Sequence, residues 1–455
     1  MRPLLLAALL LAAPALAQPA GRIETAVRLR DAALAANPAW PLLVDLTDNV
    51  GPRLAGTEAE GRGRGWAKAA MQKLGLTNIR EEAFPITVWE RGQEQASIIG
   101  SNHRLAIAAL GGSGATPATG ITAPVSCFDN LAALRAAPES EVKGRIIFID
   151  HRMTVTQDGS SYGINGAVRR AGPALAAQKG AAAVMIRSLG TDYHRNPHTG
   201  STSFPAGTAP IPAVALALPD AELVARRCAA GRLEVKLIST PTSRPGQSAN
   251  VSGEIPGSVA NEVVVLGGHL DSWDIGQGVF DDGAGVAITL AAAATIKAET
   301  ARTGQSPRRT IRVVLWGSEE IGVVGGRAYA EAHRQEQIVL AGESDFGADR
   351  IWQVGSRVAE AGVPLFGEIG AVLAPLGIQP DAGNKAGGGA DVGPLAALGT
   401  GVLSLNQDGT RYFDVHHTPD DTLDKADRAQ LDQNVAAWTA AIWLAASDDR
   451  PLRTK

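Results

Sequence analysis

Apolar residues recur with two different spacings in the C-terminal half of the chain. Val263–Leu266 and Thr310–Leu315 are short, mostly apolar runs of the kind that forms buried strands. Gly285–Lys297 is Ala-rich with helical spacing, and Ala426–Ala446 carries a stripe of large apolar residues at the same spacing. Because strands and helices alternate, this half predicts an α/β fold in which helices cover both faces of a sheet.

The N-terminal half begins with two helical patterns, Ile23–Asn37 and Thr57–Leu74. Strand-like runs follow at Ile79–Val88 and Leu105–Leu110. Composition then shifts, because Gly111–Gly120 is rich in Gly, Ser, Thr and Pro. Such a shift is typical of a loop or of a boundary between domains.

The block 113–243 has a β-α-β pattern of its own. Short apolar strands are predicted at Arg145–Ile149 and Ala182–Ile186, with a helix at Gly172–Lys179 between them. A block of this kind can enclose its own core, so we expect a smaller, β-rich α+β domain inserted into the main one. The main domain then comprises two parts, residues 18–112 and 244–455.

The first residues predict a secretory signal peptide, residues 1–17. Arg2 provides the positive start, Leu4–Ala13 the apolar core, and Ala15-Leu16-Ala17 a small-residue cleavage pattern. The apolar run is shorter than the ~20 residues of a membrane span, and no later run is so long and unbroken. We therefore expect export to the periplasm or exterior, cleavage near Ala17, and no membrane association in the mature form. The alternative is a buried N-terminal helix.

Charge and cysteine content narrow the function classes. A formal net charge of −4 and the lack of any Lys/Arg-rich block argue against a nucleic-acid-binding protein. Two cysteines occur, Cys127 and Cys228. In an oxidising compartment they could pair, but free buried thiols fit the sequence equally well.

The stretch 263–285 carries the most informative polar residues. His269 and Asp271 follow an apolar run, and side chains two apart on a strand share a face. If His269 binds a metal, Asp271 is placed to accept the other imidazole proton and fix the tautomer. Asp281 and Asp282 come next, and one such carboxylate could bridge two cations. The alternatives are a surface histidine and an N-cap for the following helix.

Two later segments add candidate ligands. Glu319 and Glu320 follow a buried strand, and adjacent side chains point in different directions, so one could ligate a metal while the other acts as general base. Asp345 and His417 then add a carboxylate and an imidazole. The alternatives are a solvated acidic turn, a solvated Asp345, and a structural role for one of His416 and His417.

In chain order, these residues resemble the co-catalytic di-zinc exopeptidases. The resemblance rests on five motifs: His269-x-Asp271, Asp281-Asp282-Gly283, Glu319-Glu320, Asp345, and His417-Thr418 with Asp421-Thr422. Two contexts, Gly267-Gly-His-Leu-Asp-Ser-Trp-Asp274 and Glu343-Ser-Asp345, are most similar to the plasma glutamate carboxypeptidase branch, also called carboxypeptidase Q. Gly51-Pro-Arg53 resembles the N-terminal signature of the family, and the inserted block resembles a protease-associated domain.

The resemblance implies a mixed central sheet of the zinc exopeptidase type and two zinc ions per chain. His269 and Asp345 would hold one zinc, and Glu320 and His417 the other. Asp281 would bridge both ions. No ligand of the family set is missing, which disfavours a descendant that binds without catalysing.

The resemblance also implies two catalytic residues, Glu319 as general base and Asp271 as the residue that orients His269. The substrate class would be dipeptides or short peptides with free termini, and a homodimer is one possible assembly. Asp391 could meet a substrate amine or only cap the next helix. The alternatives are a zinc-dependent deacylase of N-acyl amino acids and a receptor-like binding protein without turnover.

Overall fold

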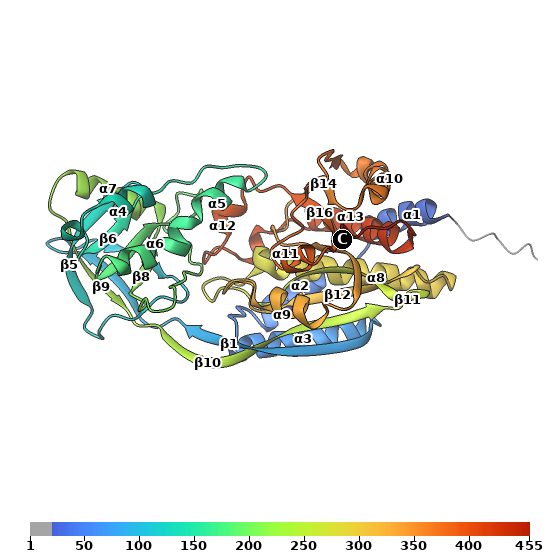
Figure 1. Ribbon diagram of the computed structural model, residues 1–455, viewed down its shortest axis with the longest axis horizontal. Helices are drawn as coiled ribbons and strands as arrows, with labels where there is room; N and C mark the ends of the chain where they lie inside the picture. The colour runs from blue at the N-terminus through green and yellow to red at the C-terminus, as the bar shows by residue number, and fades with distance from the viewer. Residues whose placement is uncertain (1–20) are drawn as a thin grey trace, which may run out of the picture.

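The computed structural model describes residues 21–455, so the predicted signal peptide lies outside the described residues. Two eight-stranded sheets, each with its own helices, lie toward opposite ends of the long axis of the molecule (Figure 1). The main sheet takes strands from both sides of the second sheet in sequence, so the second unit is an insertion in the chain. The α/β class with a mixed sheet is confirmed.

The main sheet has the order β1-β10-β12-β11-β13-β16-β14-β15. Its strands are β1 (Thr77–Glu90), β10 (Thr242–Ile255), β11 (Val259–His269), β12 (Arg309–Trp316), β13 (Gln337–Glu343), β14 (Ile351–Arg357), β15 (Gln379–Pro380) and β16 (Gly401–Gln407). The four central strands β12, β11, β13 and β16 run parallel, whereas β10 pairs antiparallel with β12, and β14 antiparallel with β16.

Helices cover both faces of this sheet. The helices of the main domain are α1 (Arg22–Ala35), α2 (Ala39–Asn49), α3 (Glu58–Lys73), α8 (Ala284–Thr303), α9 (Val324–Ala332), α10 (Val363–Leu373), α11 (Val392–Ala397), α12 (Tyr412–Val415) and α13 (Arg428–Ser447), and all but the short α12 pack around this sheet. Val264 and Leu266 of β11 pack on the face covered by α8 and α13, while Val263 and Val265 pack on the face covered by α9 and α11. Alternate residues of β11 point to opposite faces, and both faces are buried. The sequence of β11 over residues 263–266 is therefore a continuous apolar run.

Helix α8 is the central helix of the larger face. The segment 279–303 is long and apolar enough to cross a membrane, but 89% of its most apolar window is buried inside the protein. It packs against α2 and α13. Its composition is therefore that of a core helix.

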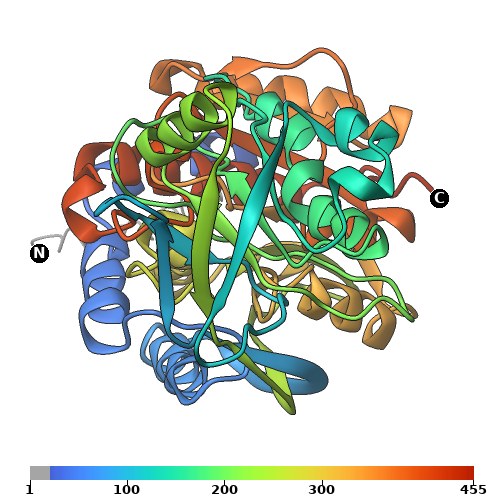
Figure 2. The ribbon, with the colours of Figure 1, turned by 90° about the vertical axis from the view of Figure 1, so that its left-hand side faces the viewer.

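The second sheet has the order β3-β2-β9-β5-β6-β7-β8-β4. Its strands are β2 (Glu94–Ile98), β3 (Arg104–Leu105), β4 (Ile107–Ala109), β5 (Ile121–Phe128), β6 (Ile146–Ile149), β7 (Ala183–Arg187), β8 (Ala213–Leu216) and β9 (Glu234–Ser239). Its helices are α4 (Leu131–Ala136), α5 (Ser160–Asn165), α6 (Ala167–Gln178) and α7 (Leu218–Ala229). Figure 2 looks onto this unit, which we call the inserted unit.

The inserted unit begins earlier in the chain than the expected residue 113. Leu105–Leu110, expected as one strand of the main domain, holds the last residue of β3 and the whole of β4, and β4 pairs with β8 of the second sheet. Strand β2 pairs with β9. These strands have five, two and three residues, too few to show a period in the sequence. Counted by its sheet, the inserted unit spans residues 94–239.

Cys127 and Cys228 form a disulfide within the inserted unit. Cys127 lies on β5 and Cys228 on α7, with a Cα–Cα distance of 6.4 Å. Of the two states that the sequence left open, the structure has the paired one. The bond closes a loop across most of this unit.

Candidate metal centre

The ends of three neighbouring parallel strands carry most of the predicted site residues. Strand β11 ends at His269, Glu319 and Glu320 follow β12, and Asp345 follows β13. Carboxyl ends of parallel strands meet at one edge of a sheet, so these side chains converge there. Apolar runs predict the strands before His269 and Glu319, whereas no strand is predicted before Asp345.

Two loops complete the cluster. Asp281 lies in the turn η2 (Val279–Gly283) that leads into α8, and His417 follows the short helix α12. Asp281 Oδ1 lies 3.0 Å from His269 Nε2, and Oδ2 lies 2.9 Å from His417 Nε2. His269 Nε2 is also 3.3 Å from Asp345, and His417 Nε2 is 2.9 Å from Glu320. Each imidazole thus faces two carboxylates, and Asp281 is common to both.

The orientation of both imidazoles leaves Nε2 available to a metal. Nδ1 of His269 lies 2.9 Å from the backbone oxygen of Asp271, and Nδ1 of His417 lies 3.2 Å from that of Thr199. Because a carbonyl oxygen only accepts, Nδ1 of His269 carries the proton in the neutral ring, whereas Nδ1 of His417 also lies 3.3 Å from the donor Arg169 Nη1. Nε2 of His269 then presents a lone pair to two carboxylates, an arrangement that a cation between them stabilises. The donor set therefore fits a metal centre.

The burial and the charges of these side chains also favour a bound cation. Asp281 Oδ2 and Glu320 Oε1 are buried and accept no hydrogen bond from the described residues. Burial raises the pKa of Asp345, and it raises the pKa of Glu320 to about 7. Burial acts to lower the pKa of His417, but the facing Glu320 and Asp281 raise it well above its ordinary value. The buried carboxylates therefore stabilise a positive charge in the space between them and the imidazoles.

Comparison with known proteins identifies the family. The model of peptidase family M28 matches residues 250–442. Carboxypeptidase Q of Bos taurus is 35% identical over 90% of this chain and 86% of its own length. Carboxypeptidase Q of Homo sapiens is 33% identical over 92% of this chain and 87% of its own. The chain belongs to peptidase family M28.

Solved structures agree with this assignment. The M28 peptidase precursor from Shewanella amazonensis superposes with a TM-score of 0.91 at 42% identity, covering 95% of this chain and 98% of that one. A zinc aminopeptidase from Bacillus subtilis has a TM-score of 0.63 at 21% identity, covering 90% and 95%, and it shares the fold. The resemblance seen in the sequence motifs is confirmed, and the M28 chain is a metallopeptidase.

Asp271 contacts its surroundings differently from the expectation. Its backbone oxygen, rather than its carboxylate, accepts from His269 Nδ1, and the carboxylate lies 3.7 Å from that nitrogen. The carboxylate instead accepts from the backbone N–H groups of Glu319, at 3.0 Å, and Glu320, at 3.3 Å. Asp271 thus links the end of β11 to the acidic pair after β12. The sequence spacing could not distinguish the carbonyl of a residue from its carboxylate.

Asp282 and His416 also lie in the cluster. Sets of ligand atoms within 4.8 Å of one another include both, alongside the five predicted ligands. The Asp282 carboxylate accepts from the N–H groups of His269 and Gly285, which occupies it with backbone contacts. His416 stacks on His417 with ring centroids 3.6 Å apart. Both residues therefore contact, and help to position, members of the set of five predicted ligands of this M28 chain.

Glu319 lies on the wall of a cavity of about 340 Å³ beside the cluster. Asp281, Glu320 and Asp345 line the same cavity. Burial raises the pKa of Glu319 well above its ordinary value, with Asp345 and Glu320 adding to the rise against the opposing effect of His269. A buried carboxyl group beside the candidate ligands is placed to exchange protons with a molecule in the cavity.

Two further buried residues, to which the sequence assigns no role of their own, hold the Asp281 turn. The Asp421 carboxylate accepts from the backbone N–H groups of Val279, at 3.0 Å, and Phe280, at 2.6 Å. Arg53 is fully buried and donates to the backbone oxygens of Gly51, Leu270, Gln277 and Gly278. Their only sequence signal was membership of the two motifs Gly51-Pro-Arg53 and Asp421-Thr422.

Trp273 was also missed. Its Nε1 donates to Glu320 Oε2 at 2.6 Å, and its ring packs edge-on against His417 with centroids 5.8 Å apart. One indole therefore fixes two of the candidate ligands. The residue stands in the Gly267–Asp274 motif, which is the signal that could have identified it.

Two acids singled out in the sequence lie away from the ligands. Asp274 pairs with Arg91 at 2.8 Å, next to the start of the inserted unit. Asp391 is fully buried, accepts from the N–H of Gly326 at 2.9 Å, and makes no side-chain cap to α11. The cavity beside Glu319 is lined by Ala390 but not by Asp391. The geometry favours neither reading that the sequence left open for Asp391.

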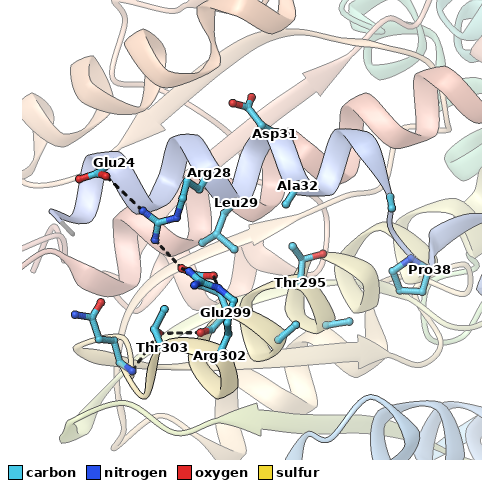
Figure 3. A pocket seen from close by; sticks show the side chains of 14 residues that line it. Glu24, Arg28, Leu29, Asp31, Ala32, Pro38, Thr295, Glu299, Arg302 and Thr303 are labelled. Atoms are coloured by element: carbon cyan, nitrogen blue, oxygen red, sulfur yellow. Dashed lines mark hydrogen bonds and ion pairs between the residues drawn. The ribbon is translucent and has the colours of Figure 1, made fainter. Parts of the chain in front are cut away.

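A larger cavity, of about 1270 Å³, lies elsewhere, between α1 and the C-terminal part of α8 (Figure 3). Its charged side chains pair with one another, as Arg28 does with Glu299 at 2.7 Å and Arg302 with Glu299 at 2.9 Å. No histidine lines it, and it lacks the convergent ligands of the strand-end cluster. We therefore take the smaller cavity as the candidate active site.

Proposed function

We propose that this chain is an exported di-zinc exopeptidase that hydrolyses dipeptides or short peptides at the end with a free carboxylate. The observation that carries the proposal is the pair of imidazole–carboxylate clusters joined through Asp281, next to a cavity with Glu319 on its wall. The similar proteins of Bos taurus and Homo sapiens are carboxypeptidases by name, which supports this class of activity.

The five ligands divide into two sets. His269 and Asp345 would hold one zinc ion, Glu320 and His417 the other, and Asp281 would be shared, as the contacts of its two oxygens support. Nitrogen and carboxylate ligands without cysteine suit Zn²⁺. When bound, zinc supplies Lewis-acid polarisation of the scissile carbonyl and acidifies the attacking water.

Glu319 moves the protons in this proposal. Its carboxylate accepts a proton from the water that attacks the peptide carbonyl carbon, and then donates that proton to the leaving amine as the C–N bond breaks. Water and peptide thus become a carboxylic acid and an amine, with Glu319 returned to its starting state. The contact between its backbone N–H and the Asp271 carboxylate holds the residue in place for both transfers.

Two arginines of helix α6 support recognition of a carboxylate. Arg169 and Arg170 line the same cavity as the acidic residues, and neither forms an ion pair within residues 21–455. Arg169 is 6% exposed, with Nη1 3.3 Å from the His417 ring and Nε without a hydrogen-bond partner. One residue of peptide spans ~3.8 Å between Cα atoms. A C-terminal carboxylate paired with these arginines would thus place the preceding peptide bond near the metal ligands.

A substrate panel tests the proposal. Zinc-loaded mature protein is expected to cleave a free dipeptide, and to cleave the C-terminally amidated dipeptide about 100-fold less efficiently because the carboxylate contact is lost. Arg170→Gln should raise KM for the free dipeptide and leave the amide unaffected, whereas Arg135→Gln, on the exposed side of α4, should change neither. Equal turnover of the free and amidated dipeptides would contradict recognition of the carboxyl end.

N-acyl amino acids are a second candidate substrate class, because they also carry a free carboxylate beside an amide bond. The same panel includes them. If the protein cleaves N-acyl amino acids and no dipeptide, it is a deacylase and the peptidase proposal is wrong. A protein that binds dipeptides with zinc present but does not cleave them would instead be a binding protein.

Export rests on the predicted signal peptide. Mass spectrometry of the protein recovered from the exterior or periplasm should give an N-terminus near Gln18. An intact Met1 on the functional protein would contradict this part of the proposal.

A further inference from the structure

The inserted unit touches the main domain at the loop that carries His417. Residues 191–199, which we call the clamp segment, make these contacts. The Thr191 side chain donates to Asp414 at 2.6 Å, and the Thr191 N–H donates to the Phe413 oxygen at 3.1 Å. At the other end of the segment, the Thr199 N–H donates to the His417 oxygen at 2.9 Å. The two units therefore meet at a metal-ligand loop.

His417 needs such support because its backbone is in a left-handed conformation, with a φ of 60°. A residue with a β-carbon pays about 1–3 kcal/mol for this conformation. Thr199 contacts His417 twice, since its N–H donates to the His417 carbonyl and its carbonyl oxygen lies 3.2 Å from His417 Nδ1. One residue of the inserted unit thus fixes both the backbone and the ring of a candidate ligand.

His198 supports the neighbouring peptide. Its ring is buried, with Nδ1 2.8 Å from the backbone oxygen of His416 and Nε2 2.8 Å from the Asp192 carboxylate. Both ring nitrogens face acceptors, so the ring links Asp192 to the His416 carbonyl. Gly190 makes room for it, because a β-carbon there would lie 2.1 Å from His198 Nε2. The contact is built by three residues of the inserted unit and none of them touches the cavity beside Glu319.

We propose that the clamp segment is a positioning element for the metal centre, in which Asp192 and His198 hold the His416–His417 loop so that His417 Nε2 faces Asp281 and Glu320. The inserted unit then contributes to the metal centre, because the zinc affinity of the site that contains His417 depends on the contact between the inserted unit and the main domain. The inference rests on the proposed function, because it takes His417 to be a zinc ligand.

Zinc affinity tests the inference directly. In the full mature protein, competition with a chromogenic chelator should show that His198→Ala weakens one of the two zinc sites by about tenfold and leaves the other unchanged. His198→Asn should recover part of the loss, because its amide nitrogen can donate to the His416 oxygen from about the position of Nδ1. In a dipeptide assay at limiting zinc, His198→Ala should lower kcat more than it raises KM.

A second route perturbs the same contact without removing the imidazole. Gly190→Ala should displace the His198 ring and weaken the same zinc site, so the test stands even if His198→Ala fails to fold. Tyr193→Ala is the matched control, since Tyr193 lies in the clamp segment but its side chain is 67% exposed. Its zinc affinities should equal those of the wild type.

The outcomes separate the inference from the function on which it rests. A wild type with two zinc sites, together with His198→Ala and Gly190→Ala variants of unchanged affinity, would overturn the clamp alone. A wild type that binds no zinc would overturn the clamp and the proposed function together.

Discussion

Asp281 lies between two imidazoles, with one oxygen 3.0 Å from His269 Nε2 and the other 2.9 Å from His417 Nε2. The turn that carries it is held by backbone contacts to Asp421 and Arg53. At the scale of single residues, the geometry of Asp281 therefore depends on groups outside the five candidate ligands. Each of these groups has a separable consequence when it is changed.

Glu319→Gln separates proton transfer from metal binding. The amide keeps the size of the side chain but cannot accept the proton of the attacking water, so kcat should fall by orders of magnitude while metal content stays at the wild-type value. Glu331→Gln, whose side chain on α9 is 75% exposed, is the control. Normal hydrolysis by Glu319→Gln would exclude it as the base.

Arg53→Leu should reduce stability strongly. The substitution leaves the oxygens of Leu270, Gln277 and Gly278 without their donor in a buried site, at a cost of about 3 kcal/mol or more. Urea unfolding measures the loss. Arg62→Leu on the exposed side of α3 should change the free energy of unfolding by less than about 0.5 kcal/mol. Similar losses in the two variants would show that the carbonyl contacts matter little.

At the scale of elements, the end of α9 is tied to β1 by a charged cluster. His333, just after α9, lies 3.0 Å from Glu82 of β1 and 2.8 Å from Glu336. Burial acts against the charged ring, but these carboxylates raise the pKa of His333 from 6.5 to about 9. The hydrogen bond from His333 is the main reason that the pKa of Glu336 falls to about 2.

The His333 pKa predicts how stability depends on pH. Below pH 6.5 the imidazole is protonated in both the folded and unfolded states, and its contribution to stability is fully present. As pH rises toward 9, the unfolded state loses the proton first and the contribution is lost. Between pH 6 and 9 the free energy of unfolding should therefore fall by about 1–3 kcal/mol more in the wild type than in His333→Gln.

Urea unfolding at the two pH values measures this difference. Gln335→Ala, an exposed position next to the cluster with no ionisable group, is the control and should retain the wild-type dependence. Parallel pH profiles for the wild type and His333→Gln would contradict the assigned role of the cluster.

At the scale of the whole molecule, the candidate site joins parts that are distant in sequence. The strand-end residues His269 and Glu319 could be placed from the sequence, because each follows a predicted strand and parallel strands end at one edge. No strand is predicted before Asp345, which only the family resemblance places beside them. Thr199 and Arg169 could not be placed in this way. They come from the inserted unit, and no local pattern shows that its loops meet the main domain.

Two other expectations, the contact made by Asp271 and the start of the inserted unit, also differ from the structure because no local sequence pattern shows the contacts involved. Asp271 was assigned to the right neighbour but through its carboxylate, because sequence spacing does not fix a side-chain rotamer. The expected start of the inserted unit, residue 113, is too late because β2, β3 and β4 have only five, two and three residues and leave no period to detect. Contacts made by backbone groups and short strands are thus what sequence patterns miss.

Metal content tests the central claim most directly. Mature protein, loaded with zinc and dialysed against metal-free buffer, is analysed for zinc by mass spectrometry and for protein by amino-acid analysis. The proposed site predicts two equivalents of zinc per chain, because Asp281 can serve two ligand sets at once. Retention of no zinc, or of only one equivalent at saturation, would contradict a di-zinc centre.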